Sequence, residues 1–69
     1  MHLSARNVLK GHVTQVTHGA VESEIVITLP GGVEIVSTIT KASAERMHLR
    51  PGMEAQAIIK ASSVIVGVD

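Results

Sequence analysis

Apolar residues recur at every second position in part of this chain, which is the period of a β-strand that buries one face. Residues 21–29 alternate in this way, and residues 7–17 and 33–40 also have β character. Two more β-segments, 54–61 and 62–68, close the sequence and are rich in apolar residues. The pattern therefore predicts five β-segments in a mainly β protein.

The alternation also assigns side chains to faces. In 7–17, the even-numbered positions from Val8 to Val16 share one face, and the odd-numbered positions from Leu9 to Thr17 share the other. In 21–29, the odd-numbered positions from Val21 to Leu29 share a face. "THGA" (17–20), "LPGGV" (29–33) and "LRPGM" (49–53) are turn signals between the segments. The segments on either side of "PGG" are expected to pair as a hairpin.

The period changes to that of a helix in residues 40–49. Ala42, Glu45, Arg46 and Leu49 follow helical spacing, and the hydroxyl of Thr40 suits an N-cap. We expect one short helix of about two turns. Five β-segments with a helix before the fourth predict a small barrel of the OB type.

Length and composition favour association. The chain has 69 residues, so we expect a single domain, 1–69. A domain of this size buries only about 60% of its unfolded surface and usually needs disulfides, a metal or oligomerisation. There is no cysteine and no aromatic residue, yet 45% of the residues are apolar. We therefore expect a homo-oligomer with closed symmetry.

The formal net charge is zero, so the basic excess of a duplex-binding domain is missing. No apolar run is long enough to span a membrane, and "MHLSARN" lacks the apolar core of a signal peptide. We expect a cytoplasmic protein with no nucleic-acid or membrane partner.

No residue pattern indicates an enzyme. Glu22 and Glu24 share a strand face but fit a solvated hairpin. The four histidines have no zinc-site spacing, and no cysteine could complete such a site; they are His2, His12, His18 and His48. We expect neither catalysis nor a bound metal cation.

The unusual polar residues are all hydrogen-bond donors. Arginine offers a planar fork of donors, lysine a compact positive charge, and the free amides at a helix start also favour an anion. If Lys60 is enclosed by its apolar neighbours, it needs an anionic partner, because a buried lysine is costly when unpaired. An oxyanion site fits these donors, which are Ser4 and Arg6, Thr40 and Ser43, and Lys60 with Ser62 and Ser63.

Structural roles remain open for the same residues. Thr40 and Ser43 are also ordinary helix-capping types, and Lys60 at a strand edge would reach water. Arg6 would pair equally well with a surface glutamate. The residues alone do not decide between these roles and an anion site.

Three stretches together resemble one known family. "SARNVLKGHV" (4–13), "TKAS" (40–43) and "LRPGMEAQAIIKASSVIVGV" (49–68) are similar to the molbindins, the small molybdenum-pterin-binding or Mop proteins. The same module occurs as the TOBE-type domain of molybdate transporter ATPases and molybdate-responsive repressors. The resemblance covers essentially the whole chain. It implies an OB-like barrel and a hexamer arranged as a trimer of dimers, with molybdate or tungstate held at subunit interfaces.

The resemblance also implies which residues hold the anion. Ser4, Arg6 and Lys60 match the motif residues of one subunit, while Thr40 and Ser43 match those of its neighbour. Ser62 and the main chain around Ala5 and Ala61 are additional candidates. Gly19 and Ala20 are candidates for a second anion site near the threefold axis. Family members often have lysine or asparagine at the positions of His12 and His18. The two histidines of this chain would make the second anion site pH-dependent.

The expected function is binding and storage of molybdate, with tungstate as an alternative ligand and no turnover. The apolar residues around Lys60 are expected to build the barrel and the subunit contact. Two alternatives remain: a structural oligomerisation module without a specific ligand, and a nucleic-acid-binding OB module. The second lacks the aromatic residues on which single-strand binders stack bases.

Overall fold

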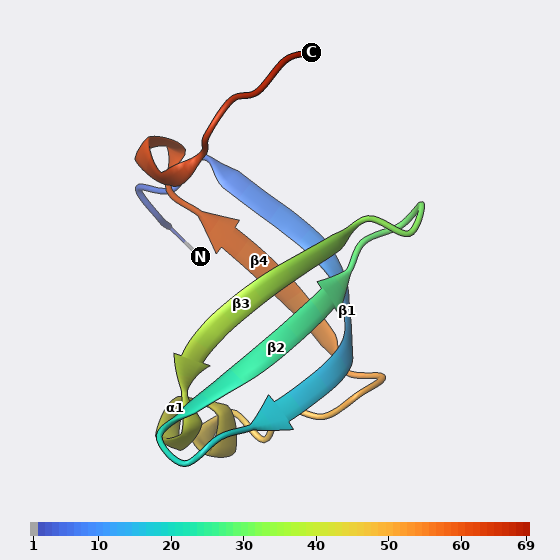
Figure 1. The fold of residues 1–69 in the computed structure, drawn as a ribbon, viewed down its shortest axis with the longest axis vertical. Helices are drawn as coiled ribbons and strands as arrows, with labels where there is room; N and C mark the ends of the chain where they lie inside the picture. The colour runs from blue at the N-terminus through green and yellow to red at the C-terminus, as the bar shows by residue number, and fades with distance from the viewer. Residues whose placement is uncertain (1) are drawn as a thin grey trace.

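The computed structural model describes residues 2–69 and confirms a mainly β protein with one short α-helix (Figure 1). Within those residues the elements run β1 (Asn7–His18), β2 (Glu22–Thr28), β3 (Glu34–Thr40), α1 (Lys41–Arg46), β4 (Glu54–Ile59) and the single 3-10 turn η1 (Ala61–Ser63). The four strands form one antiparallel sheet in the order β3-β2-β1-β4. The sheet curls, and α1 lies at one end of it.

The core lies on the inner face of the curled sheet. Val13, Ile25 and Ile27 of the two central strands pack there with Ala57 of β4 and Ala44 of α1. Partly buried aliphatic and methionine side chains surround this cluster. The β2 alternation is confirmed, because Ile25 and Ile27 point inward as predicted.

The predicted faces of β1 are wrong beyond Val13. The register passes from Val13↔Ile27 to Gln15↔Val26, so Thr14 is an extra residue on β1. Such a β-bulge exchanges the two faces of a strand from that point onward and increases its twist. Val16 therefore packs against the core with Val13, although even alternation placed it on the opposite face. The bulge also helps to curl the sheet.

The hairpin predicted around "PGG" is confirmed. β2 pairs with β3 from Glu22↔Thr40 to Thr28↔Glu34, and the Leu29 amide donates to the Val33 carbonyl at 2.7 Å. Gly31 and Gly32 have φ of 95° and 94°, a region in which only glycine is free of strain. The local turn chemistry was therefore sufficient to predict this pairing.

The helix is present but shorter than the predicted span of 40–49. Thr40 is the N-cap as expected, and its side chain accepts a hydrogen bond from the Ser43 amide. At the other end the His48 amide donates to Glu45 and the Leu49 amide to Ala44. With His48 at a φ of 54°, this is the Schellman arrangement, which ends the helix before Leu49.

Replacing His48 by glycine is expected to raise the free energy of unfolding by roughly 0.5–1 kcal/mol, because a side chain in the left-handed region is strained. Urea unfolding should show a higher midpoint with an unchanged slope. His48→Ala is the matched control, since alanine keeps a Cβ at the same φ. An equal gain in both variants would contradict this explanation.

Among residues 2–69 of one chain, the fifth predicted strand (62–68) is absent, and so is the closed five-stranded barrel. β4 ends at Ile59 and Lys60 becomes the N-cap of η1, while residues 64–69 pair with no strand among residues 2–69. A β-strand requires a partner for its backbone groups, and η1 turns the chain away from the sheet (Figure 1). The chain alone is an open four-stranded half-barrel.

None of the helices between residues 2 and 69 is long and apolar enough to span a lipid bilayer.

Candidate functional site

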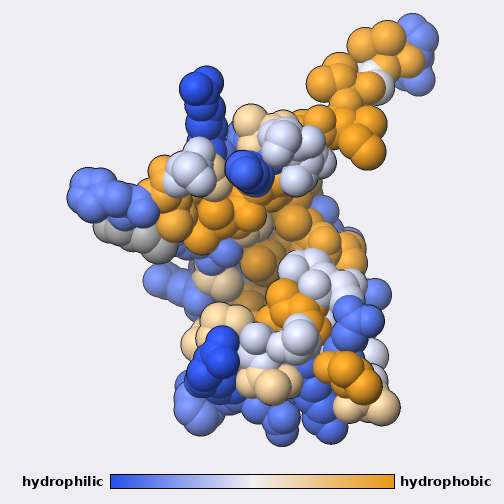
Figure 2. Space-filling view, turned by 90° about the vertical axis from the view of Figure 1, so that its left-hand side faces the viewer, coloured by the Kyte–Doolittle hydropathy of each residue, from blue (hydrophilic) through white to orange (hydrophobic). Residues whose placement is uncertain are grey.

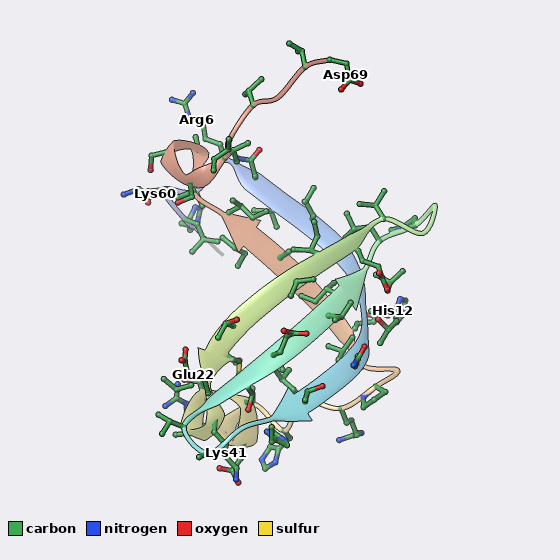
Figure 3. The ribbon with its side chains drawn as sticks, in the orientation of Figure 1. Arg6, His12, Glu22, Lys41, Lys60 and Asp69 are labelled. Carbon is green, nitrogen blue, oxygen red and sulfur yellow. The ribbon has the colours of Figure 1, made fainter. Side chains whose placement is uncertain are left out.

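The pairing of β1 with β4 brings the first and last groups of predicted donors together. The ladder ends at Asn7↔Ile59, and the sum of paired residue numbers is constant along it. Arg6 and Lys60 are the residues next to this last pair, so both chain segments leave the sheet at the same end (Figure 3). We call residues 4–6 and 60–62, which flank this end of the ladder, the η1 cluster.

Backbone and side-chain hydrogen bonds hold the η1 cluster in place. The Asn7 side-chain amide donates to the Ile59 carbonyl at 3.1 Å, which fixes the last pair of the ladder. The Ser63 amide donates to the Lys60 carbonyl at 2.8 Å, and the Val64 amide to Ala61 at 3.2 Å. These bonds form the tight turn that carries Ser62.

The charged side chains of the η1 cluster face solvent. Arg6 and Lys60 are both exposed and project from the same end of the molecule (Figure 3). The enclosure of Lys60 considered from the sequence is therefore not found within one chain, where this residue is exposed. No carboxylate belongs to this cluster, so every polar side chain in it is able to donate.

Thr40 and Ser43 form a second donor group at the start of α1. Thr40 Oγ1 accepts from the Ser43 amide at 3.1 Å and lies 2.8 Å from Ser43 Oγ, to which it donates. The capping role of Thr40 is thus confirmed. Because Ser43 Oγ accepts this bond, its own proton remains available for a further acceptor.

The two donor groups lie at opposite ends of the folded molecule. Figure 3 places Arg6 and Lys60 at the end from which η1 emerges, and Lys41, the residue after Thr40, at the α1 end. The molecule is 35 Å long in its longest dimension. One chain therefore does not bring Thr40 and Ser43 to the η1 cluster, and a site that contains both groups requires two chains.

The turn with Gly19 and Ala20 lies near α1 and not near the η1 cluster. Both residues are exposed, and the Gly19 amide donates to the Glu22 carbonyl at 2.8 Å. The Lys41 amide donates to the Val21 carbonyl at 2.8 Å, which ties this turn to the helix start.

Two of the four histidines lie in β1. His12 pairs with Glu54 across β1 and β4 and is exposed, and His18 Nδ1 lies 2.6 Å from Ser23 Oγ. Ser23 is only 1% exposed, and the sequence had not marked it as unusual, although it is a hydroxyl on the apolar face of β2. Among residues 2–69, no group of three or more His, Cys, Asp or Glu side chains is placed to hold a metal ion.

Neither of two pockets on the surface of residues 2–69 is lined by the predicted donors. One, of about 460 Å³, lies between the edge strands β3 and β4, over the apolar floor of Val13, Ile25 and Ile27. We call it the β3–β4 groove. The other, of about 650 Å³, is lined by polar and apolar side chains of β1 and β4, including Lys10, His12 and Glu54.

Comparison with known proteins connects this arrangement to a family. The family model described as the TOBE domain matches residues 3–66. A probable molybdenum-pterin-binding protein of Haemophilus influenzae is 45% identical over 69 residues, which is all of both chains. The molybdenum-pterin-binding protein MopA of Rhodobacter capsulatus is 46% identical over 96% of this chain, which spans only 25% of MopA.

Solved structures agree with the fold. A crystal structure of the cytoplasmic molybdate-binding protein ModG with molybdate bound superimposes with a TM-score of 0.96 at 48% identity, over all of this chain and 49% of ModG. MopII from Clostridium pasteurianum superimposes with a TM-score of 0.91 at 36% identity, over 97% of this chain and all of MopII.

Proposed function

Because the chain belongs to the TOBE-domain family, and within it to the molybdenum-pterin-binding (Mop) proteins, we propose that it binds and stores molybdate. The observation that carries the proposal is the η1 cluster, in which the β1–β4 pairing brings Arg6 and Lys60 to the same end of the sheet, and which contains two serines and no carboxylate. The molybdate-bound ModG structure supports it, because its backbone follows this one over the whole chain.

We place the anion between two chains of a homo-oligomer. The η1 cluster of one chain supplies the charges of Arg6 and Lys60, and the other chain supplies the hydroxyls of Thr40 and Ser43. Ser4, Ser62 and the amides of Ala5 and Ala61 add neutral donors. The distance between the two donor groups within one chain supports this division. A hexamer arranged as a trimer of dimers, and a second anion site at Gly19 and Ala20, remain predictions from the family resemblance.

Donor-only chemistry suits molybdate. Molybdate is a tetrahedral dianion without a proton at neutral pH, so each oxygen can accept from a donor. Phosphate is partly protonated near pH 7, and its O–H group would face donors with no acceptor, which is costly in a desolvated site. Sulfate carries no proton, but its shorter bonds would leave some donors out of reach. Tungstate nearly matches molybdate in size and charge.

The donors present are sufficient for useful affinity. A micromolar dissociation constant corresponds to about 8 kcal/mol. A few hydrogen bonds to a charged group, at about 1.5–3 kcal/mol each, supply this after desolvation. Because both chains contribute donors, the anion would also stabilise the oligomer by linkage.

We propose storage in the cytoplasm without turnover, since the η1 cluster and the Thr40–Ser43 pair hold no acid–base pair. The η1 cluster also favours an anion site over a purely structural oligomerisation module. A nucleic-acid-binding role has less support, because the chain has no aromatic residue and no net charge.

Titration calorimetry on the purified protein tests the proposal. Molybdate and tungstate should bind with similar, micromolar or tighter, dissociation constants, and sulfate and phosphate at least about tenfold more weakly. Equal binding of sulfate and molybdate would contradict a selective site. A parallel titration with a pterin should give no heat, because the chain offers no aromatic side chain for the ring to stack on.

A further inference from the structure

A carboxylate lies directly beside the second donor group. In the β2–β3 ladder Glu22 is the partner of Thr40, and Figure 3 places Glu22 at the α1 end of the molecule. Partners in an antiparallel pair lie on the same face of the sheet, with their Cβ atoms about 5 Å apart. The long side chain of Glu22 is therefore able to bring its carboxylate to the hydroxyls of Thr40 and Ser43.

Within one chain this carboxylate is in contact with water. Glu22 and Thr40 are both exposed, and Figure 2 shows that the lower end of the molecule, which carries α1, is mostly hydrophilic. Lys41 lies at the same end, but its amide donates to the Val21 carbonyl, so its place in the ladder is one step beyond Glu22. The cross-strand partner of Glu22 is thus the neutral Thr40 and not a cation.

The two-chain site of the proposed function brings Glu22 close to two positive charges. Thr40 and Ser43 of one chain meet the η1 cluster of the other, so the carboxylate beside Thr40 meets Arg6 and Lys60. Two cations by themselves neutralise a dianion such as molybdate. With Glu22 present, the empty site carries one excess positive charge, and the filled site carries one excess negative charge. By Coulomb's law, the carboxylate stabilises the empty site and opposes the bound anion.

On the basis of that two-chain site, we propose that Glu22 competes with molybdate for Arg6 and Lys60 of the neighbouring chain. In the empty site the carboxylate pairs with these cations, and the arriving anion displaces it into water. The competition lowers the affinity for the anion. It also keeps the bound molybdate exchangeable, as a store requires in order to release its content.

Titration calorimetry at constant ionic strength tests the competition. Glu22→Gln keeps the size of the side chain without its charge, and it should bind molybdate roughly tenfold more tightly than the wild type, because a repulsion with the dianion is removed. Glu22→Asp keeps the charge and should stay close to the wild type. Glu34→Gln is the matched control, since Glu34 is also an exposed glutamate but pairs with Thr28 at the other end of the same ladder. Its affinity should be unchanged.

Thermal melting provides a second measurement. Glu22→Gln should lower the Tm of the molybdate-free assembly, which loses an ion pair between chains, and should increase the upward shift that molybdate produces. A residue needed only for folding would lower the Tm without tightening the binding of molybdate. Equal or weaker molybdate binding by Glu22→Gln, relative to Glu34→Gln, would overturn the competition and leave the proposed storage function intact. A wild-type protein that binds no molybdate would overturn both.

Discussion

Replacing Lys60 by alanine is expected to weaken molybdate binding by roughly ten- to a hundredfold. Lys60 supplies one of the two positive charges of the η1 cluster, and a hydrogen bond from a charged group contributes about 1.5–3 kcal/mol. The variant should stay folded, because the Lys60 side chain is exposed and makes no capping hydrogen bond. Titration calorimetry at constant ionic strength measures the change.

The matched control for this variant is Lys10→Ala. Lys10 is also an exposed lysine, but it lies within β1 opposite Gln56 and outside the η1 cluster. Both substitutions remove one positive charge, so a general electrostatic effect would weaken both variants equally. Unchanged affinity in the Lys60 variant would refute the assignment of this residue to the site.

Replacing Gly11 by alanine is expected to cost about 1–3 kcal/mol of unfolding free energy, the usual range for overpacking. A Cβ on Gly11 would overlap the carbonyl oxygen of Thr28 and lie 3.1 Å from the Ile27 side chain. The oxygen belongs to the backbone of β2, which is held by pairing with both β1 and β3, so it has little freedom to move.

The loss would be large for so small a domain, whose total stability is expected to be only about 3–10 kcal/mol at 0.05–0.15 kcal/mol per residue. Urea unfolding of Gly11→Ala, compared with Lys10→Ala on the same strand, measures it. The exposed control should change stability by less than about 0.5 kcal/mol. Equal midpoints for the two variants would mean that the strands separate more easily than the structure implies.

Local chemistry explains which elements the sequence predicted well. The β2–β3 hairpin depends on neighbouring residues, with two glycines at positive φ between alternating strands, and it was confirmed. The Thr40 cap is equally local. The face of Val16 was predicted wrongly, because the bulge at Thr14 exists only in relation to the pairing partner β2. Likewise, the helix end at His48 depends on where Leu49 finds its contacts with the core.

In the candidate site, too, neighbouring residues revealed the donor types, whereas strand pairing determined their positions. The sequence marked Arg6, Thr40 and Lys60 as donors, and that assignment stays a prediction until binding is measured. The family resemblance implied that Arg6 and Lys60 act in one subunit and Thr40 in its neighbour, but composition and periodicity did not show where these residues lie in one chain. That placement follows from the β1–β4 register, which joins residues more than fifty positions apart.

The sequence by itself determined the mainly β class, the hairpin, the start of the helix and the family, because alternation, turn residues and motifs are properties of neighbouring residues. Only the tertiary structure decided that one chain forms an open half-barrel, that Arg6 and Lys60 lie at the end opposite α1, and that Val64–Val68 leaves its own sheet. The physical reason is that strand pairing satisfies backbone hydrogen bonds between distant segments. Which edge a segment pairs with is therefore decided by the whole fold.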